Sequence, residues 1–118
     1  MKEYILFIRT DGDHLDSLSP EEQQKHVQKA AEYIDRLSKT NKLKGAQPLE
    51  FKGALIASRN GKVKDGPFNE SKEVIMGYFH ISADDLNEAV EIAKAHPILK
   101  ETDAKIEVRE IRHLEGIN

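Results

Sequence analysis

The chain has 118 residues, of which 33% are charged and 38% hydrophobic, with a net charge of −3 and no cysteine. This length allows one domain with a substantial core, and the lack of cysteine excludes a disulfide framework and a thiolate zinc site. No apolar run approaches the roughly 20 residues of a membrane span, and the first residues lack the pattern of a secretory signal. We therefore expect a cytoplasmic protein without a membrane partner.

The first predicted strand covers residues 2–9 and is apolar on both of its faces. One face carries Tyr4, Leu6 and Ile8, and the other carries Ile5 and Phe7. After a polar loop, Ser19 is expected to begin a helix with Pro20 at its first position and Glu22 placed for a capping box. The helix should continue to about residue 40, with one apolar stripe formed by Val27, Ala30, Ala31, Ile34 and Leu37.

The second half of the chain is predicted to be richer in strands. A short strand over residues 43–48 precedes a hairpin over residues 53–63, because Asn60-Gly61 suits a type I′ turn. The strand over residues 74–81 is again apolar on both faces, which we assign as Val74, Met76 and Tyr78 against Ile75, Phe79 and Ile81. Ser82 is expected to cap a second helix that Pro97 ends, and residues 105–112 form the last strand.

This order of elements favours a ferredoxin-like α+β sandwich with an inserted β-hairpin and two helices on one sheet face. At least two strands are apolar on both faces, yet no element of the chain is left to cover the second face. An apolar patch of that size is rarely left exposed in a monomer. We therefore expect a homodimer in which the two sheets pack face to face.

Residues 65–68 interrupt the strand-rich region with Asp65, Gly66, Pro67 and Phe68. Pro67 has no backbone N–H, and Gly66 suits a sharp turn, so we expect a loop here and not a strand. The simplest interpretation is a turn in which the Asp65 carboxylate accepts a backbone N–H of that loop. The alternative is a functional loop.

Several motifs occur in an order that favours the second interpretation of this loop. They are the opening Met1-Lys2-Glu3-Tyr4-Ile5-Leu6-Phe7, the helix start Ser19-Pro20-Glu21-Glu22, Asp65-Gly66-Pro67-Phe68, Gly77-Tyr78-Phe79, Asp84-Asp85-Leu86, His96-Pro97 and Ile106-Glu107-Val108-Arg109. This order resembles the YCII-related superfamily, specifically its DGPF-domain branch, over nearly the whole chain. The resemblance implies a dimeric α+β barrel and leaves the biochemical activity unassigned.

Histidines are the candidate acid–base groups, because imidazole titrates near neutral pH. His26 lies at the edge of the first helix's apolar stripe, and His96 at the end of the second helix, where the macrodipole favours the charged form. The alternative for both is a structural role at a helix boundary. The resemblance implies a histidine on the first helix paired with an acidic residue, often the one before the proline. Here these positions hold Ala30 and His96, so Asp65 is the alternative acidic partner of His26.

We therefore expect a helix–sheet pocket that does proton-transfer chemistry on a small organic molecule. Its catalytic groups would be His26, Asp65 and His96, and its walls Phe68, Tyr33 and Tyr78. No cofactor or metal is expected, since the donors of residues 11–14 lack the spacing of a known metal loop. The alternative is a non-catalytic dimeric binding or accessory protein, because members similar to this one occur joined to transcription-related domains. A histidine–carboxylate contact in a pocket would favour the enzyme, and a filled helix–sheet interface the accessory protein.

A nucleic-acid partner is not expected, although one segment of the chain is basic. Residues 36–64 hold eight basic side chains and one acidic side chain, a net charge of +7, between two acidic segments. Such a segment can attract an anionic ligand or nucleic acid. No aromatic or arginine-rich pattern accompanies it, so we interpret it as a solvated surface.

Overall fold

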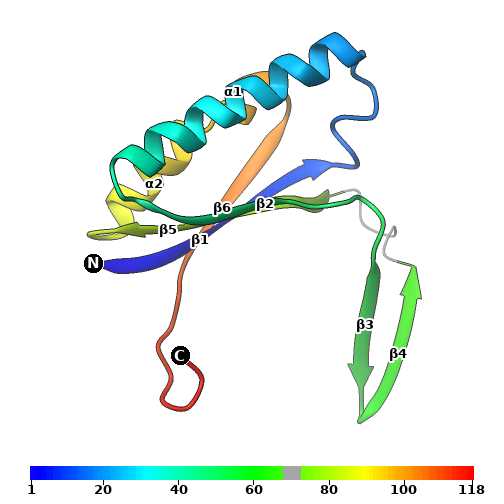
Figure 1. Ribbon diagram of the computed structural model, residues 1–118. Helices are drawn as coiled ribbons and strands as arrows, with labels where there is room; N and C mark the ends of the chain where they lie inside the picture. The colour runs from blue at the N-terminus through cyan, green and yellow to red at the C-terminus, as the bar shows by residue number, and fades with distance from the viewer. Residues whose placement is uncertain (68–72) are drawn as a thin grey trace.

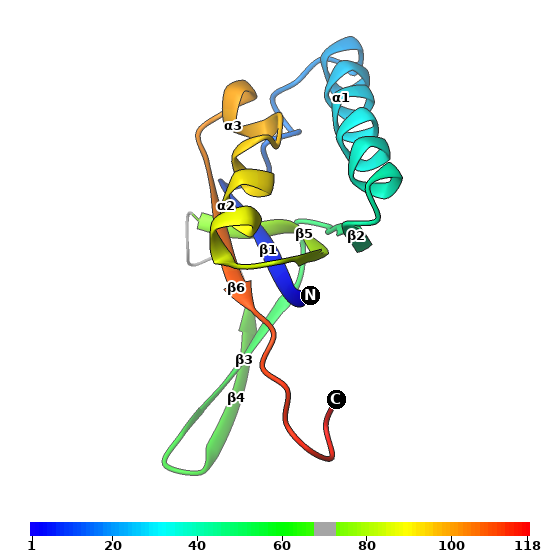
Figure 2. The ribbon, with the colours of Figure 1, turned by 90° about the vertical axis from the view of Figure 1, so that its left-hand side faces the viewer.

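The computed structural model describes residues 1–67 and 73–118, and its main sheet has four antiparallel strands. The sheet order is β2-β5-β1-β6, formed by β1 (Lys2–Asp11), β2 (Leu43–Pro48), β5 (Glu73–Ala83) and β6 (Ala104–Glu110). Helices α1 (Pro20–Lys39), α2 (Leu86–Lys94) and the short α3 (Ile98–Glu101) cover one face of this sheet (Figures 1 and 2). The predicted ferredoxin-like α+β fold is therefore confirmed.

The core lies between the helices and the sheet. From β1, Tyr4, Leu6 and Ile8 are buried against the helices, because side chains alternate along a strand. Tyr33 is the most deeply buried side chain of α1, and its hydroxyl donates a 2.5 Å hydrogen bond to the carbonyl of Ile92 on α2. This bond links the two long helices above the sheet.

The two helix starts differ in how well their caps were predicted. Ser19 forms the expected capping box with Glu22 at the start of α1. The prediction that Ser82 caps α2 is wrong, because Ser82 lies in β5 and its backbone N–H donates to the Lys42 carbonyl at 2.8 Å. Asp85 is the cap instead, and its carboxylate accepts the N–H of Glu88 at 2.8 Å.

An irregularity in β5 changes which of its side chains share a face. The pairing register between β1 and β5 shifts near Gly77, where Ile8 pairs with Gly77 and Arg9 with Ile75. The extra residue in β5 is a β-bulge, which shifts the side-chain alternation by one. Val74 and Phe79 are therefore both in the core, and Tyr78 lies on the opposite face, which corrects the predicted grouping of Tyr78 with Val74 and Met76.

The inserted hairpin consists of β3 (Ala54–Arg59) and β4 (Lys62–Pro67) and projects from the sheet on the side away from the helices (Figure 1). Its turn is as predicted, with φ of 52° at Asn60 and 79° at Gly61. The prediction that residues 65–67 cannot be a strand is wrong, since Asp65, Gly66 and Pro67 pair with β3. Proline is tolerated here because β4 belongs to a two-stranded sheet, in which each strand is an edge strand.

Asp65 is exposed, and the backbone contact predicted for its carboxylate does not occur among the described residues. Phe68, the last residue of the predicted loop, lies outside the described residues. As for membranes, none of the helices that the structure describes combines the length and the apolar character needed to cross one.

Candidate functional site

A cavity of about 310 Å³ lies between α1 and the sheet, next to β2 and β5. Its lining is mostly apolar and includes Ala30 and Ile34 of α1 and Met76 and Phe79 of β5. The polar side chains among the described lining residues are Gln47 and three histidines, His14, His26 and His96. No lysine, arginine, aspartate or glutamate belongs to the part of this lining that the structure describes. The cavity can therefore enclose an apolar molecule beside several imidazole rings.

His26 contacts a carboxylate at this cavity. Its Nδ1 lies against Oε2 of Glu101, the last residue of α3, and the two side chains are only 15% and 20% exposed. Pro97 stands before α3 with a φ of −63°, the value that starts a helical turn without strain. The short helix thus places Glu101 over the second turn of α1. A carboxylate in this position holds the imidazole ring in one orientation.

His14 lies on the other side of His26, so that Glu101, His26 and His14 form a row of three side chains. Its Nε2 lies 3.3 Å from Nε2 of His26, and the two rings meet edge to face. The loop that carries it is held by the Asp13 carboxylate, which accepts the N–H of Leu15, and by the Gln23 amide, which donates to the Leu15 carbonyl. Burial, and then the neighbouring His26, lower the pKa of His14 below its ordinary value of 6.5. His14 is therefore neutral at neutral pH.

His96 lines the same cavity but is held differently. It is 6% exposed, its ring packs against Tyr33 and Phe79, and its Nδ1 accepts the N–H of Ile98 at 3.1 Å. Burial lowers the pKa of His96 to about 4. The helix macrodipole was expected to favour the charged form of this ring, but loss of hydration outweighs a dipole effect of at most about 2 kcal/mol.

The other predicted site residues do not join this group. Asp65 lies on the hairpin and is not part of the cavity lining. Tyr33 is a buried core residue and Tyr78 faces the other side of the sheet, so neither lines the cavity, and Phe68 is outside the described residues. Glu101 was not predicted as the acidic partner of His26. The sequence signal for the short helix that carries Glu101 was Pro97, because proline favours the start of a helix as well as its end.

Comparison with known proteins identifies the family. The family model of the YCII-related domain matches residues 2–115. The chain belongs to the YCII-related family. No curated protein matches the chain. Among solved structures, a de novo designed protein, Foldit4, is 16% identical, covers 95% of this chain and 97% of its own, and superimposes with a TM-score of 0.39.

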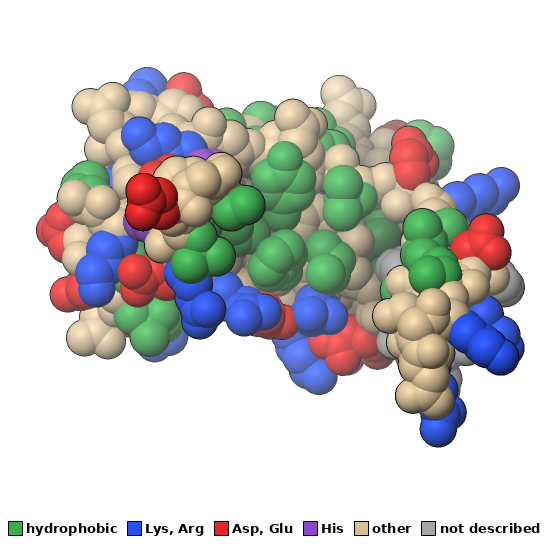
Figure 3. Space-filling model, turned by 90° about the horizontal axis from the view of Figure 1, so that it is seen from below, with side chains coloured by type: hydrophobic (Ala, Val, Ile, Leu, Met, Phe, Trp, Pro, Cys, Tyr) green, Lys and Arg blue, Asp and Glu red, His purple; other side chains and the backbone are tan. Residues whose placement is uncertain are grey.

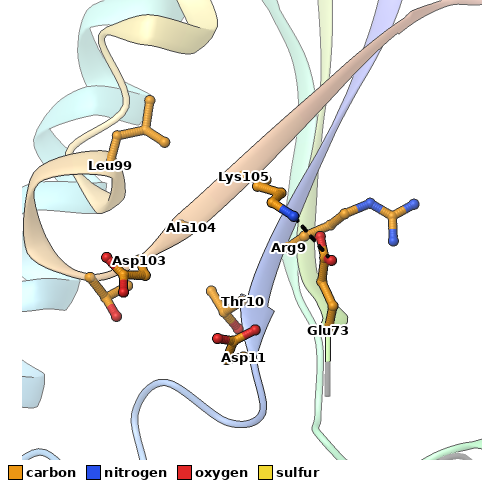
Figure 4. A pocket seen from close by; sticks show the side chains of 9 residues that line it. Arg9, Thr10, Asp11, Glu73, Leu99, Asp103, Ala104 and Lys105 are labelled. Carbon is orange, nitrogen blue, oxygen red and sulfur yellow. Dashed lines mark hydrogen bonds and ion pairs between the residues drawn. The ribbon is translucent and has the colours of Figure 1, made fainter. Parts of the chain in front are cut away.

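This YCII-related domain has a second cavity of about 290 Å³ at the other edge of the sheet (Figure 4). Asp11 and Asp103 face it, and the guanidinium of Arg9 points away from both (Figure 4). Its cations are already paired, since Lys105 contacts Glu73 at 3.4 Å and Arg9 contacts Glu107 at 2.8 Å. Nothing in this cavity matches the contact between His26 and Glu101, so the histidine-lined cavity is the candidate functional site.

Proposed function

We propose that this chain, a member of the DGPF-domain branch, is a cytoplasmic protein that binds a small organic molecule in the histidine-lined cavity. His26, oriented by Glu101, then moves a proton on that molecule. The observation that carries the proposal is the contact between His26 Nδ1 and Glu101 Oε2 beside an apolar cavity of about 310 Å³. When His26 takes a proton, the carboxylate stabilises the imidazolium, which is how such pairs act in general acid–base catalysis.

The same observation favours an enzyme over a non-catalytic accessory protein. A purely structural helix–sheet interface is expected to be filled by side chains at close-packed density. Here space remains between α1 and the sheet, and Val27 and Leu49, which line it, are exposed apolar side chains. A bound molecule that covered them would remove apolar surface from water.

Ligand binding tests this proposal. A metabolite library screened by thermal shift should yield compounds that raise the melting temperature of the wild-type protein, since they bind the native state. His26→Gln and Glu101→Gln should each weaken that binding, and any conversion of the compound, followed by NMR, should slow by about 10²- to 10⁴-fold. His113→Gln is the matched control, because His113 is exposed near the C-terminus. The His113→Gln control should behave like the wild type, and the proposal fails if the compounds stabilise His26→Gln and Glu101→Gln as well as the wild type and are converted as fast by them.

We further propose that the partner of this chain is a second copy of itself, bound through the sheet face opposite the helices. This open face carries Ile5, Phe7, Ile75 and Tyr78, none of which is fully buried. Figure 3 views the molecule from this side, and hydrophobic side chains gather at the centre of the face between charged ones.

The surface area of the chain supports this partner. A compact monomer of 13.4 kDa should expose about 6,500 Å², whereas this chain exposes 8889 Å². Its radius of gyration is 16.1 Å, against about 13.5 Å for a compact domain of this length. The excess of about 2,400 Å² exceeds the roughly 800 Å² that each partner buries in a standard interface. A second copy on the open face would bring the exposed area per chain back toward the normal value.

The β3–β4 hairpin belongs to the same proposal. Ile56 and Val63 are each 70% exposed, and Figures 1 and 2 show the hairpin extending away from the body of the molecule. An isolated two-stranded hairpin is only marginally stable in water. At about 3.3 Å per residue, its six-residue strands extend for about 20 Å. That length exceeds the spacing of about 10 Å between stacked sheets, so the hairpin is long enough to pack along the second copy.

A further inference from the structure

Residues 112–118, beyond β6, form a hook whose shape is held by its own hydrogen bonds. The side-chain oxygen of Asn118 accepts the N–H of Leu114 at 2.9 Å, and its amide donates to the Arg112 carbonyl at 3.0 Å. The N–H of Ile117 donates to the Leu114 carbonyl at 2.9 Å. The hook is therefore a defined turn of the chain.

This hook holds apolar side chains in water. Leu114 is 51% exposed and Ile117 is 78% exposed. Every residue from 112 to 118 is exposed, so the body of the same chain buries none of them. Removing these two side chains from water would be favourable, but only another molecule can cover them.

One face of the β3–β4 hairpin has the same character. Residues paired across an antiparallel hairpin share a face, and Ile56 pairs with Asp65 and Val63 with Ser58. Ile56 and Val63 therefore lie on one face as diagonal neighbours, and each is 70% exposed. The opposite face carries the basic residues of the hairpin, Arg59, Lys62 and Lys64.

The hook and the hairpin lie on the same side of the sheet but toward opposite ends of it. Figure 1 shows both extending downward from the sheet, the hairpin on the right and the hook toward the left, so they do not touch within one chain. In a two-fold dimer both copies use the same surface, and each contact occurs twice. A two-fold axis below the open face that exchanges its two ends would bring each hook to the hairpin of the other copy.

Charge favours this arrangement over the one that leaves the ends in place. In that alternative the two hairpins would lie side by side, and the three basic residues of each would repel those of the other. The hook carries one basic and one acidic side chain, Arg112 and Glu115, besides His113. Pairing hook with hairpin therefore avoids the repulsion and covers the apolar side chains of both.

We propose that residues 112–118 are a dimerisation hook, in which Leu114 and Ile117 of one copy pack against Ile56 and Val63 of the other. This inference rests on the second copy proposed above and names the two segments that hold it. The open sheet faces meet between them, and each dimer contains the contact between hook and hairpin twice.

Cysteine cross-linking of the full chain tests this contact, because the chain has no cysteine of its own. Val63→Cys and Ile117→Cys are prepared separately, mixed in equal amounts until the copies exchange, and treated with a short bismaleimide linker. The mixture should give a covalent species of twice the chain mass of 13.4 kDa on a denaturing gel, and neither variant alone should do so. Gln24→Cys mixed with Ile117→Cys is the control, because Gln24 is exposed on α1.

Two results of this experiment would overturn the inference. Val63→Cys that cross-links by itself as strongly as in the mixture would place hairpin beside hairpin. A mixture that gives no more product than the control would show that the hook does not reach the hairpin of the other copy.

A substitution in the hook measures what the contact contributes. Ile117→Asp should raise the dissociation constant of the dimer by about tenfold or more, because each dimer loses two apolar contacts and gains two charges. Leu86→Asp is the matched control and should dimerise like the wild type, because Leu86 is 54% exposed at the start of α2, on the helix side of the sheet. Equal dimerisation of Ile117→Asp and the wild type would contradict the inference.

Sedimentation of the wild type separates this inference from the proposal on which it rests. If the wild type is a dimer and the mixture does not cross-link, the second copy stands and only the contact between hook and hairpin is wrong. If the wild type is a monomer, both are wrong.

Discussion

The ring of His96 lies between Tyr33 and Phe79, and its Nδ1 accepts the backbone N–H of Ile98. A proton on Nδ1 would remove that acceptor and place a charge in a nearly dry site. Burial, and then the neighbouring His26, lower the pKa of His96 to about 4 in the folded protein, against 6.5 for an ordinary histidine. His14 shows the same trend for the same reason, burial beside other imidazoles. The cavity thus keeps at least these two rings in the neutral form that can accept a proton.

The pKa of His96 predicts how stability changes with pH. Below pH 6.5 the unfolded chain binds a proton at this residue before the folded chain does, so stability is present above pH 6.5 and is lost as pH falls toward 4. At about 1.4 kcal/mol per pH unit, His96 should lower the free energy of unfolding by about 2 kcal/mol between pH 7 and pH 5. Urea denaturation at several pH values measures this loss.

His96→Asn is the informative variant, because the Asn side-chain oxygen can still accept the N–H of Ile98 but does not titrate. Its stability should fall less steeply between pH 7 and pH 5 than that of the wild type. His113→Asn, which changes an exposed histidine, should follow the wild-type curve. Identical slopes in all three proteins would contradict the assignment of the pH dependence to His96.

At the scale of the elements, β2 and β5 form one wall of the cavity, and their spacing depends on Gly77. A Cβ atom at Gly77 would lie 3.1 Å from the backbone oxygen of Gln47 on β2. Backbone cannot rotate away as a flexible side chain can, so β2 would have to shift. The absence of a side chain at Gly77 therefore lets Gln47 and Pro48 of β2 approach β5 at the bulge.

Gly77→Ala should lower the free energy of unfolding by about 1–3 kcal/mol, the usual cost of forcing extra volume into a packed site. Gly45→Ala, on β2 itself, is the control, because a Cβ there meets nothing within 4 Å. The control should be neutral or slightly stabilising, since alanine restricts the unfolded chain. Equal destabilisation by the two variants, measured by urea denaturation, would show that the contact with Gln47 has no special role.

At the scale of the whole molecule, helices cover one sheet face, and the other face and the hairpin are left open. In Figure 1 the open face of the sheet points downward, and the hairpin extends in the same direction. This is the side on which a second copy would bind. On the open face, His80 and Glu3 contact each other at 2.7 Å, and Arg9 contacts Glu107. These pairs would neutralise charges that the proposed dimer brings out of water.

Sedimentation equilibrium at micromolar concentration should give twice the chain mass of 13.4 kDa. Phe7→Lys places a charge at the centre of the open face and should shift the equilibrium to monomer, because a buried unpaired charge is costly. Gln24→Lys, on the exposed side of α1, adds the same charge elsewhere and should remain a dimer. A wild-type protein that sediments only as a monomer would refute the face-to-face dimer.

Local patterns in the sequence determined most of the fold. The alternation of Tyr4, Leu6 and Ile8, the capping box at Ser19 and the Asn60-Gly61 turn each depend on neighbouring residues, and all three are present as predicted. Only the tertiary structure decided the bulge at Gly77, the strand at residues 65–67 and the pairing of His26 with Glu101. The two members of that pair are 75 residues apart in the chain. Their contact depends on how α1 and α3 pack on the sheet, and no local spacing encodes that packing.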